Sequence, residues 1–173
     1  MGPDFETWLQ NLKTYCEANT NPFKMQEIIV DAQAYLTIRE TVSSNEKNGV
    51  YGRIFGEIAS YLLNKGGVPS PKPIAIYYST SDKKLDMELG IAVKKEYKET
   101  DRIKYKMMES RKALVVSHFG KYEDLEKTYN SIINFMGKRQ YTVNGAPWEQ
   151  YITDPSREPD TSKWETKIYF PIL

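Results

Sequence analysis

Apolar residues recur every three or four positions at the start of the chain, which is the spacing of one face of an amphipathic helix. The series begins at Phe5 and ends at Tyr15. Residues 19–22 then bring two asparagines and a proline, a combination typical of a helix end. We therefore expect residues 1–23 to form an appended N-terminal helix and a short linker.

The rest of the chain changes between the period of strands and the period of helices, in the order strand, helix, strand, strand, and this order occurs twice. In the first half we expect strands at 34–38, 74–78 and 89–93. The helix between them carries apolar residues at Tyr51, Ile54, Phe55, Ile58 and Leu62, and ends at Gly66 and Gly67. In the second half we expect strands at 113–117, 148–153 and 166–170. The helix there carries Tyr122, Leu125, Tyr129, Ile132, Ile133 and Met136.

The two halves also correspond at single positions, which favours an internal duplication with repeats at about 28–97 and 107–173. The matching pairs are Pro73 with Pro147, Tyr77 with Tyr151, and Ala75 with Glu149. Two copies of one unit usually pair about a pseudo-twofold axis, and the groove between them is a natural binding site. The predicted fold class is α+β, with duplicated β-α-β-β units and a central ligand groove in a domain spanning 24–173.

Length and charge exclude several classes of function. At 173 residues the chain suits one ordinary domain, or two small halves that share a core. Its 24 basic and 23 acidic residues nearly cancel, so no net field holds nucleic acid through its phosphates. No apolar run approaches the roughly 20 residues that cross a bilayer. We predict a cytoplasmic protein with no direct nucleic-acid partner and no membrane partner.

The inventory of cysteine and histidine is equally restrictive. Cys16 is the only cysteine and His118 the only histidine, which excludes a zinc site built from several cysteines. We predict no metal and no cofactor. Cys16 is expected to be a passive thiol on the appended helix, and His118 a strand-end or helix-capping residue.

Glu149 is the acid with the most unusual surroundings, because it lies in the aromatic and apolar run 144–152. One interpretation is an exposed strand acid paired with a nearby lysine, which is the usual situation of a glutamate. The other is a buried acid held against aromatic rings. Burial removes the water around such a carboxylate and disfavours its charged form, and a bound lipophilic cation would favour that form again. The same group could instead donate or accept a proton in catalysis.

Strand alternation predicts which residues accompany Glu149. Side chains two apart share a face, so Tyr151 should point the same way as Glu149, and the correspondence between halves adds Tyr77. The opposite face should pack under the helices, and we expect on it Ile74, Ile76 and Ile152. Trp148 should lie there too, although a bulge before the strand would turn it toward the groove. Trp164 and Tyr169 are predicted walls of the ligand pocket.

Four segments together resemble the GyrI-like effector-binding domain, the drug-sensing half of bacterial multidrug-responsive transcription activators. They are YGRIF at 51–55, HFGKY at 118–122, APWEQY at 146–151 and ETKIYFPI at 165–172. The resemblance covers about residues 24–173. It implies two β-α-β-β units around a central groove, in which lipophilic and often cationic molecules bind against a buried glutamate ringed by aromatics. Glu149 matches that glutamate.

The chain departs from the regulators at its N-terminus. A helix-turn-helix needs at least two helices, and residues 1–23 hold one. This segment instead resembles the final helix of a START-like helix-grip domain, so we expect the polypeptide to be the C-terminal piece of a longer, two-domain protein. The expected partner of the domain itself is a lipophilic small molecule.

Three functions remain open from the sequence. The first is a stand-alone module that binds a ligand through Glu149, Tyr151, Tyr77 and the rings of the final hairpin. The second is a hydrolase, because a subgroup of the resembled family hydrolyses cyclopropane-bearing toxins; Glu149 and Tyr151 would then be catalytic. The third is a protein-interaction module that modulates a partner such as DNA gyrase, as the family name implies.

Overall fold

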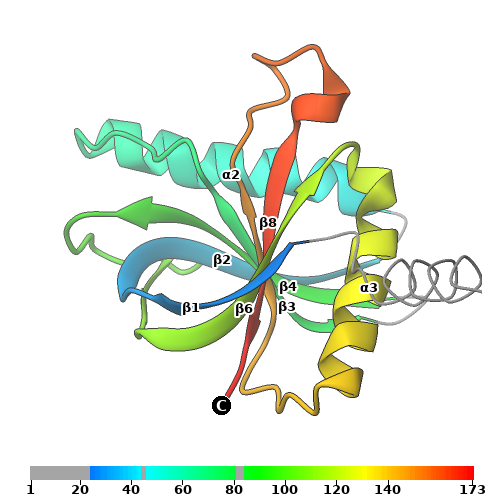
Figure 1. The fold of residues 1–173 in the computed structure, drawn as a ribbon. Coiled ribbons are helices and arrows are strands. Elements are labelled where there is room, and N and C mark those ends of the chain that lie inside the picture. Colours follow the sequence, from blue (N-terminus) through cyan, green and yellow to red (C-terminus); the bar gives the residue numbers. More distant parts are fainter. Residues whose placement is uncertain (1–23, 44–45, 81–83) are drawn as a thin grey trace, which may run out of the picture.

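The computed structural model describes residues 24–43, 46–80 and 84–173, and the predicted appended helix lies outside these ranges. One antiparallel sheet has the strand order β1-β6-β8-β7-β3-β4-β2-β5. Its strands are β1 (Met25–Val30), β2 (Gln33–Ser43), β3 (Ile74–Thr80), β4 (Lys84–Val93), β5 (Lys104–Met108), β6 (Arg111–Phe119), β7 (Trp148–Tyr151) and β8 (Glu165–Pro171). The helices are α2 (Lys47–Asn64) and α3 (Leu125–Lys138). One short 3-10 turn, Tyr122–Asp124, directly precedes α3, and another, Thr161–Lys163, lies between β7 and β8. The strands fan out about a common centre in Figure 1, which reflects the strong twist of the sheet.

The strand order confirms the predicted α+β architecture. Strand, helix, strand, strand occurs as β2-α2-β3-β4 and again as β6-α3-β7-β8, and the two units meet where β3 pairs with β7. At this junction Ala75 lies directly opposite Glu149 in the register. The duplication of one ancestral unit stays a prediction.

Two strands were not predicted. β1 pairs with β6 and β5 pairs with β2, so each of these edge strands joins the sheet half formed by the other unit. Both are short and charged, with Glu27 in β1 and Lys104 and Lys106 in β5. Charged residues protect an edge from pairing with other chains, and they also hide the alternation by which a strand is recognised.

The helix α2 has the predicted end and most of the predicted face. Ile54, Ile58 and Leu62 are buried against the sheet together with Val50, whereas the predicted Tyr51 and Phe55 are only partly buried. Beyond the helix, Gly66 adopts a φ of 69°. The N–H of Gly67 then donates to the carbonyl of Leu62 at 2.8 Å, the hydrogen bond that closes a helix by a left-handed glycine.

The two faces of the sheet correct one prediction. Ala75 and Tyr77 point toward the helices, whereas Ile74 and Ile76 lie on the opposite face, in a cluster with Trp148. That face is buried too, because the curled sheet brings Val30 of β1 and Met108 of β5 into the same cluster. Alternation separates the two faces of a strand, but it does not tell which of two apolar faces the helices cover. Ile152 follows the end of β7 and is half-buried.

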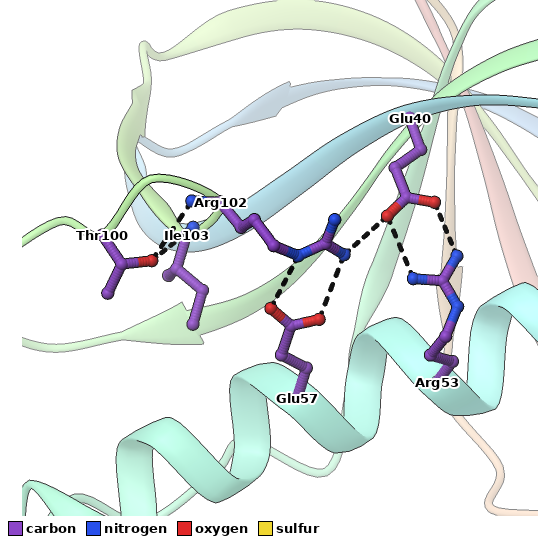
Figure 2. Close-up of polar contacts among 6 residues, drawn as sticks. All are labelled: Glu40, Arg53, Glu57, Thr100, Arg102 and Ile103. Atoms are coloured by element: carbon purple, nitrogen blue, oxygen red, sulfur yellow. Dashed lines mark hydrogen bonds and ion pairs between the residues drawn. The ribbon is translucent and has the colours of Figure 1, made fainter.

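An ion-pair network fixes the outer side of α2 (Figure 2). Glu40 of β2 accepts two hydrogen bonds from Arg53 and one from Arg102, at 2.6–3.0 Å, while Arg102 also binds Glu57. The backbone N–H groups of residues 102 and 103 donate to the Thr100 hydroxyl. Since Arg53 and Glu57 belong to α2, the network links this helix to β2 and to the connection between β4 and β5.

This network predicts an acid-sensitive contribution to stability. Arg53 and Arg102 hold the pKa of Glu40 at about 2, below the ordinary 4.5. The unfolded chain therefore takes up a proton at this carboxyl between about pH 5 and pH 2, where the folded chain does not, and acidification favours unfolding. Urea unfolding over this pH range should show a smaller loss of stability for Glu40→Gln than for wild type. Glu96→Gln, at an exposed position of the same connection, should match wild type; equal losses in all three proteins would contradict the prediction.

Candidate functional site

Glu149 is buried on the helix-covered face, with 4% of its surface exposed. One carboxylate oxygen, Oε2, accepts hydrogen bonds from the hydroxyls of Tyr151 at 2.6 Å and Tyr77 at 3.0 Å. The other, Oε1, accepts one from Tyr129 at 2.8 Å. Glu149, Tyr151 and Tyr77 therefore share a face, as alternation predicts. The hydroxyls replace the water that the buried carboxylate loses.

The hydroxyl network joins both helices to the carboxylate. The hydroxyl of Tyr51, on α2, lies 2.8 Å from the hydroxyl of Tyr77, which binds the carboxylate. Tyr129, which donates to the carboxylate directly, belongs to α3. Burial raises the pKa of Tyr51 to about 12, although its hydrogen bond to Tyr77 acts in the opposite direction. Burial and the neighbouring Glu149 charge also raise the pKa of Tyr77, Tyr129 and Tyr151. These hydroxyls stay protonated near neutral pH and act as donors.

A cavity of about 970 Å³ opens beside these groups. Its rings include Tyr51 and Phe55 of α2, and Tyr122, and each meets the ring of Tyr151 edge-on, at centroid distances of 5.7–6.3 Å. The residues 153–155, from the connection between β7 and β8, complete the wall; this connection projects beyond α2 in Figure 1.

Within the part of the chain that the structure describes, the charged side chains that line this cavity are all acidic: Glu123, Glu149 and Asp154. A second cavity of about 740 Å³ reaches Glu149 from the side of α3, and its charged lining residues are again acids. Among the described residues, no lysine or arginine forms an ion pair with Glu149. The interpretation of Glu149 as an exposed acid paired with a lysine does not hold.

The other buried glutamate of the described chain is a useful contrast. Glu88 lies on the opposite face of the sheet with 7% exposure, and Lys106 is 2.5 Å from its carboxylate. Tyr78 donates to the same oxygen. Glu88 thus has an internal counter-charge, whereas the carboxylate of Glu149 is surrounded by neutral hydroxyls.

Neither Trp164 nor Tyr169, the predicted walls of the pocket, lines either cavity, whereas Trp148 lies on the face that strand alternation predicts. Trp148 and Tyr169 stack on each other across β7 and β8, with ring centroids 4.8 Å apart, in the core of the opposite face. No bulge turns Trp148 toward the groove, and alternation puts Tyr169 on the same side. The ring of Trp164 lies with its centroid 5.5 Å from that of Tyr122, and its indole N–H donates to the carbonyl of Glu158. Trp164 therefore packs against a ring that lines the cavity.

Sequence reasoning missed Tyr51, Tyr129 and Tyr122 as site residues, because they had been assigned only to the apolar faces of helices. A signal was present. A tyrosine in a buried helix face brings a hydroxyl that needs a partner, and Glu149 was the lone acid available in a neighbouring apolar strand. His118 is structural: its ring lies 2.7 Å from the Thr128 hydroxyl and 3.2 Å from the carbonyl of Lys121.

Within the ranges that the structure describes, no group of three histidine, cysteine, aspartate or glutamate side chains is arranged to hold a metal ion. Over the same residues, no helix combines the length and apolar character needed to cross a bilayer.

Residues 23–173 match the model of the GyrI-like small molecule binding domain. The chain belongs to this family. It is a GyrI-like domain that binds small molecules, as its sequence resemblance implied. No curated protein matches the chain by sequence.

Solved structures share the fold of this GyrI-like domain. The C-terminal domain of EcmrR superposes with a TM-score of 0.76 at 19% identity, over 88% of this chain and 98% of that one. The EcmrR chain in an EcmrR–DNA complex superposes with a TM-score of 0.79 at 19% identity. The match covers 95% of this chain but only 64% of the EcmrR chain. A hydrolase from Listeria innocua gives 0.63 at 14% identity, covering 93% and 98% of the two chains. SAV2435 bound to tetraphenylphosphonium superposes with a TM-score of 0.60 at 17% identity, over 87% of this chain and 94% of that one.

The hydrogen bonds to Glu149 predict unequal effects of removing tyrosine hydroxyls. Tyr129→Phe deletes the hydroxyl that binds Oε1 of a buried carboxylate, and should lower the free energy of unfolding by about 1.5–3 kcal/mol. Tyr169→Phe removes a neutral bond to Gln150 on the opposite face, and should cost about 0.5–1.5 kcal/mol. Urea unfolding at pH 7 measures both. Equal losses would show that the Tyr129 bond is no stronger than a neutral one.

Proposed function

We propose that this GyrI-like domain binds lipophilic cations, with the positive charge of the ligand beside the Glu149 carboxylate. The observation that carries the proposal is a buried carboxylate that, among the described residues, has hydroxyl partners and no basic one. It lines a cavity whose charged residues in the described part of the chain are all acids. A cation entering this cavity meets negative charge and aromatic surface together.

Magnitudes favour the carboxylate as the main source of selectivity. Two unit charges 4 Å apart attract by about 4 kcal/mol at an effective dielectric constant of 20. A cation over an aromatic face gains about 0.5–2 kcal/mol. The rings of Tyr51, Phe55, Tyr122 and Tyr151 therefore add affinity for apolar surface, while Glu149 separates cations from neutral molecules.

The size of the cavity supports a ligand with several rings. Ligand pockets usually measure about 300–1,000 Å³, and about 970 Å³ lies near the upper end. SAV2435, which shares the fold, is recorded with tetraphenylphosphonium bound. This molecule carries one positive charge inside four phenyl rings, so it is a suitable first probe for the present chain.

Glu149→Gln tests the proposal directly, because it keeps the shape of the side chain and removes its charge. Calorimetry with tetraphenylphosphonium should show affinity at least about tenfold weaker, or about 1.4 kcal/mol. Binding of neutral triphenylphosphine oxide should change little. Glu165→Gln is the matched control, since this strand glutamate binds Ser117 and lines neither cavity. Undiminished affinity for the cation in Glu149→Gln would refute the cation site.

A hydrolase is the second candidate, because the hydroxyl of Tyr151 lies 2.6 Å from the Glu149 carboxylate and a protein of the same fold is described as a hydrolase. In this role Glu149 would accept a proton from water, with Tyr151 as a hydrogen-bond donor. Incubation with cyclopropane-bearing and ester compounds should then yield products that disappear with Glu149→Gln. Binding of such compounds without turnover by the wild type would exclude this activity for them.

A further inference from the structure

We infer that Gly52 and Gly56 of α2 determine which ligands the cavity accepts. They leave part of its wall without side chains, so that the ring system of a large ligand can lie against the helix backbone. The inference rests on the proposed function, because it concerns the same cavity. It adds a size and shape requirement that Glu149 alone does not impose.

The fold itself does not require glycine at either position. A Cβ atom added to Gly52 or Gly56 would meet no other atom within 4 Å. Both residues lie inside α2, where helical backbone suits any residue with a side chain. Other glycines of the chain differ: Gly66 has a positive φ, and a Cβ at Gly90 would come 3.0 Å from the Thr37 side chain.

Their presence also costs helix stability. A glycine in a helix interior is less favourable than alanine by roughly 0.5–1 kcal/mol, because it loses more backbone freedom on folding. Gly52 and Gly56 lie in the middle turns of the 18-residue helix, where this cost applies fully. Gly49 and Gly137 are within one turn of a helix end, where helices fray and the cost is smaller.

The position of Gly52 and Gly56 at the cavity explains the choice of glycine, which packing within the fold does not explain. Both glycines line the larger cavity, next to the row formed by Tyr51, Phe55 and Ala59 on the same helix. The row of Tyr51 and Phe55 presents aromatic rings to the cavity, whereas Gly52 and Gly56 leave the helix backbone uncovered there. The fitting ligand is a cation with several aromatic rings, one of which occupies the space that a side chain at 52 or 56 would fill. A cation with a single ring can reach Glu149 without using that space.

The test compares two cations of different size on Gly52→Leu and Gly56→Leu. Tetraphenylphosphonium should bind these variants at least about tenfold more weakly, since the leucine side chain occupies the ligand's volume. Phenyltrimethylammonium, with one ring, should bind within about twofold of wild type. The midpoint of thermal unfolding should rise, because leucine is the better helix former. Calorimetry and circular dichroism measure these quantities.

Controls separate this inference from the proposed function. Gly137→Leu, on an exposed position of α3 outside both cavities, should leave the affinity for both cations unchanged. Glu149→Gln should weaken both cations, and its failure to do so would overturn the proposed function alone. Wild-type affinity for tetraphenylphosphonium in both leucine variants would overturn the role of the glycines. A wild type that binds neither cation would overturn both proposals.

Discussion

The carboxylate of Glu149 is the group around which both halves of the domain are arranged. It lies where β7 meets β3, opposite the small side chain of Ala75, and its hydrogen bonds run to tyrosines of β3, β7 and α3. A buried carboxylate without such donors would be strongly unfavourable, so the placement of these side chains follows from a single requirement. Tyr77 and Tyr151, which bind the carboxylate, also line the larger cavity.

Much of this could be read from the sequence, and the failures have identifiable causes. Both long helices, six of the strands and the shared face of Glu149 and Tyr151 follow from periodicity. Tyr169 was assigned to the pocket as an aromatic residue of the final hairpin, yet it obeys strand alternation and lies on the other face, beside Trp148. Tyr129 was missed because the closeness of α3 to β7 depends on how the sheet twists, which no local pattern records.

The two buried glutamates show how one residue type serves different ends. Glu88 has Lys106 as its counter-charge and forms part of a closed structural cluster. Glu149 has no basic partner among the described residues, and it faces two cavities. Composition treats these residues as equal. They differ in whether the fold places a basic side chain beside the carboxylate. The sequence does not reveal this, because the basic residue, such as Lys106 for Glu88, comes from a different strand.

The exchanged edge strands have a consequence for the integrity of the domain. β1 precedes the first unit but completes the sheet of the second, and β5 precedes the second but completes the sheet of the first. Neither unit, cut out with its own leading strand, would keep all of its neighbours. The exchanged edge strands therefore tie the two units together, and the cavity where the units meet cannot be opened by moving them apart as rigid bodies. Any adjustment to a ligand must come from side chains, from α2 and α3, or from the connecting loops.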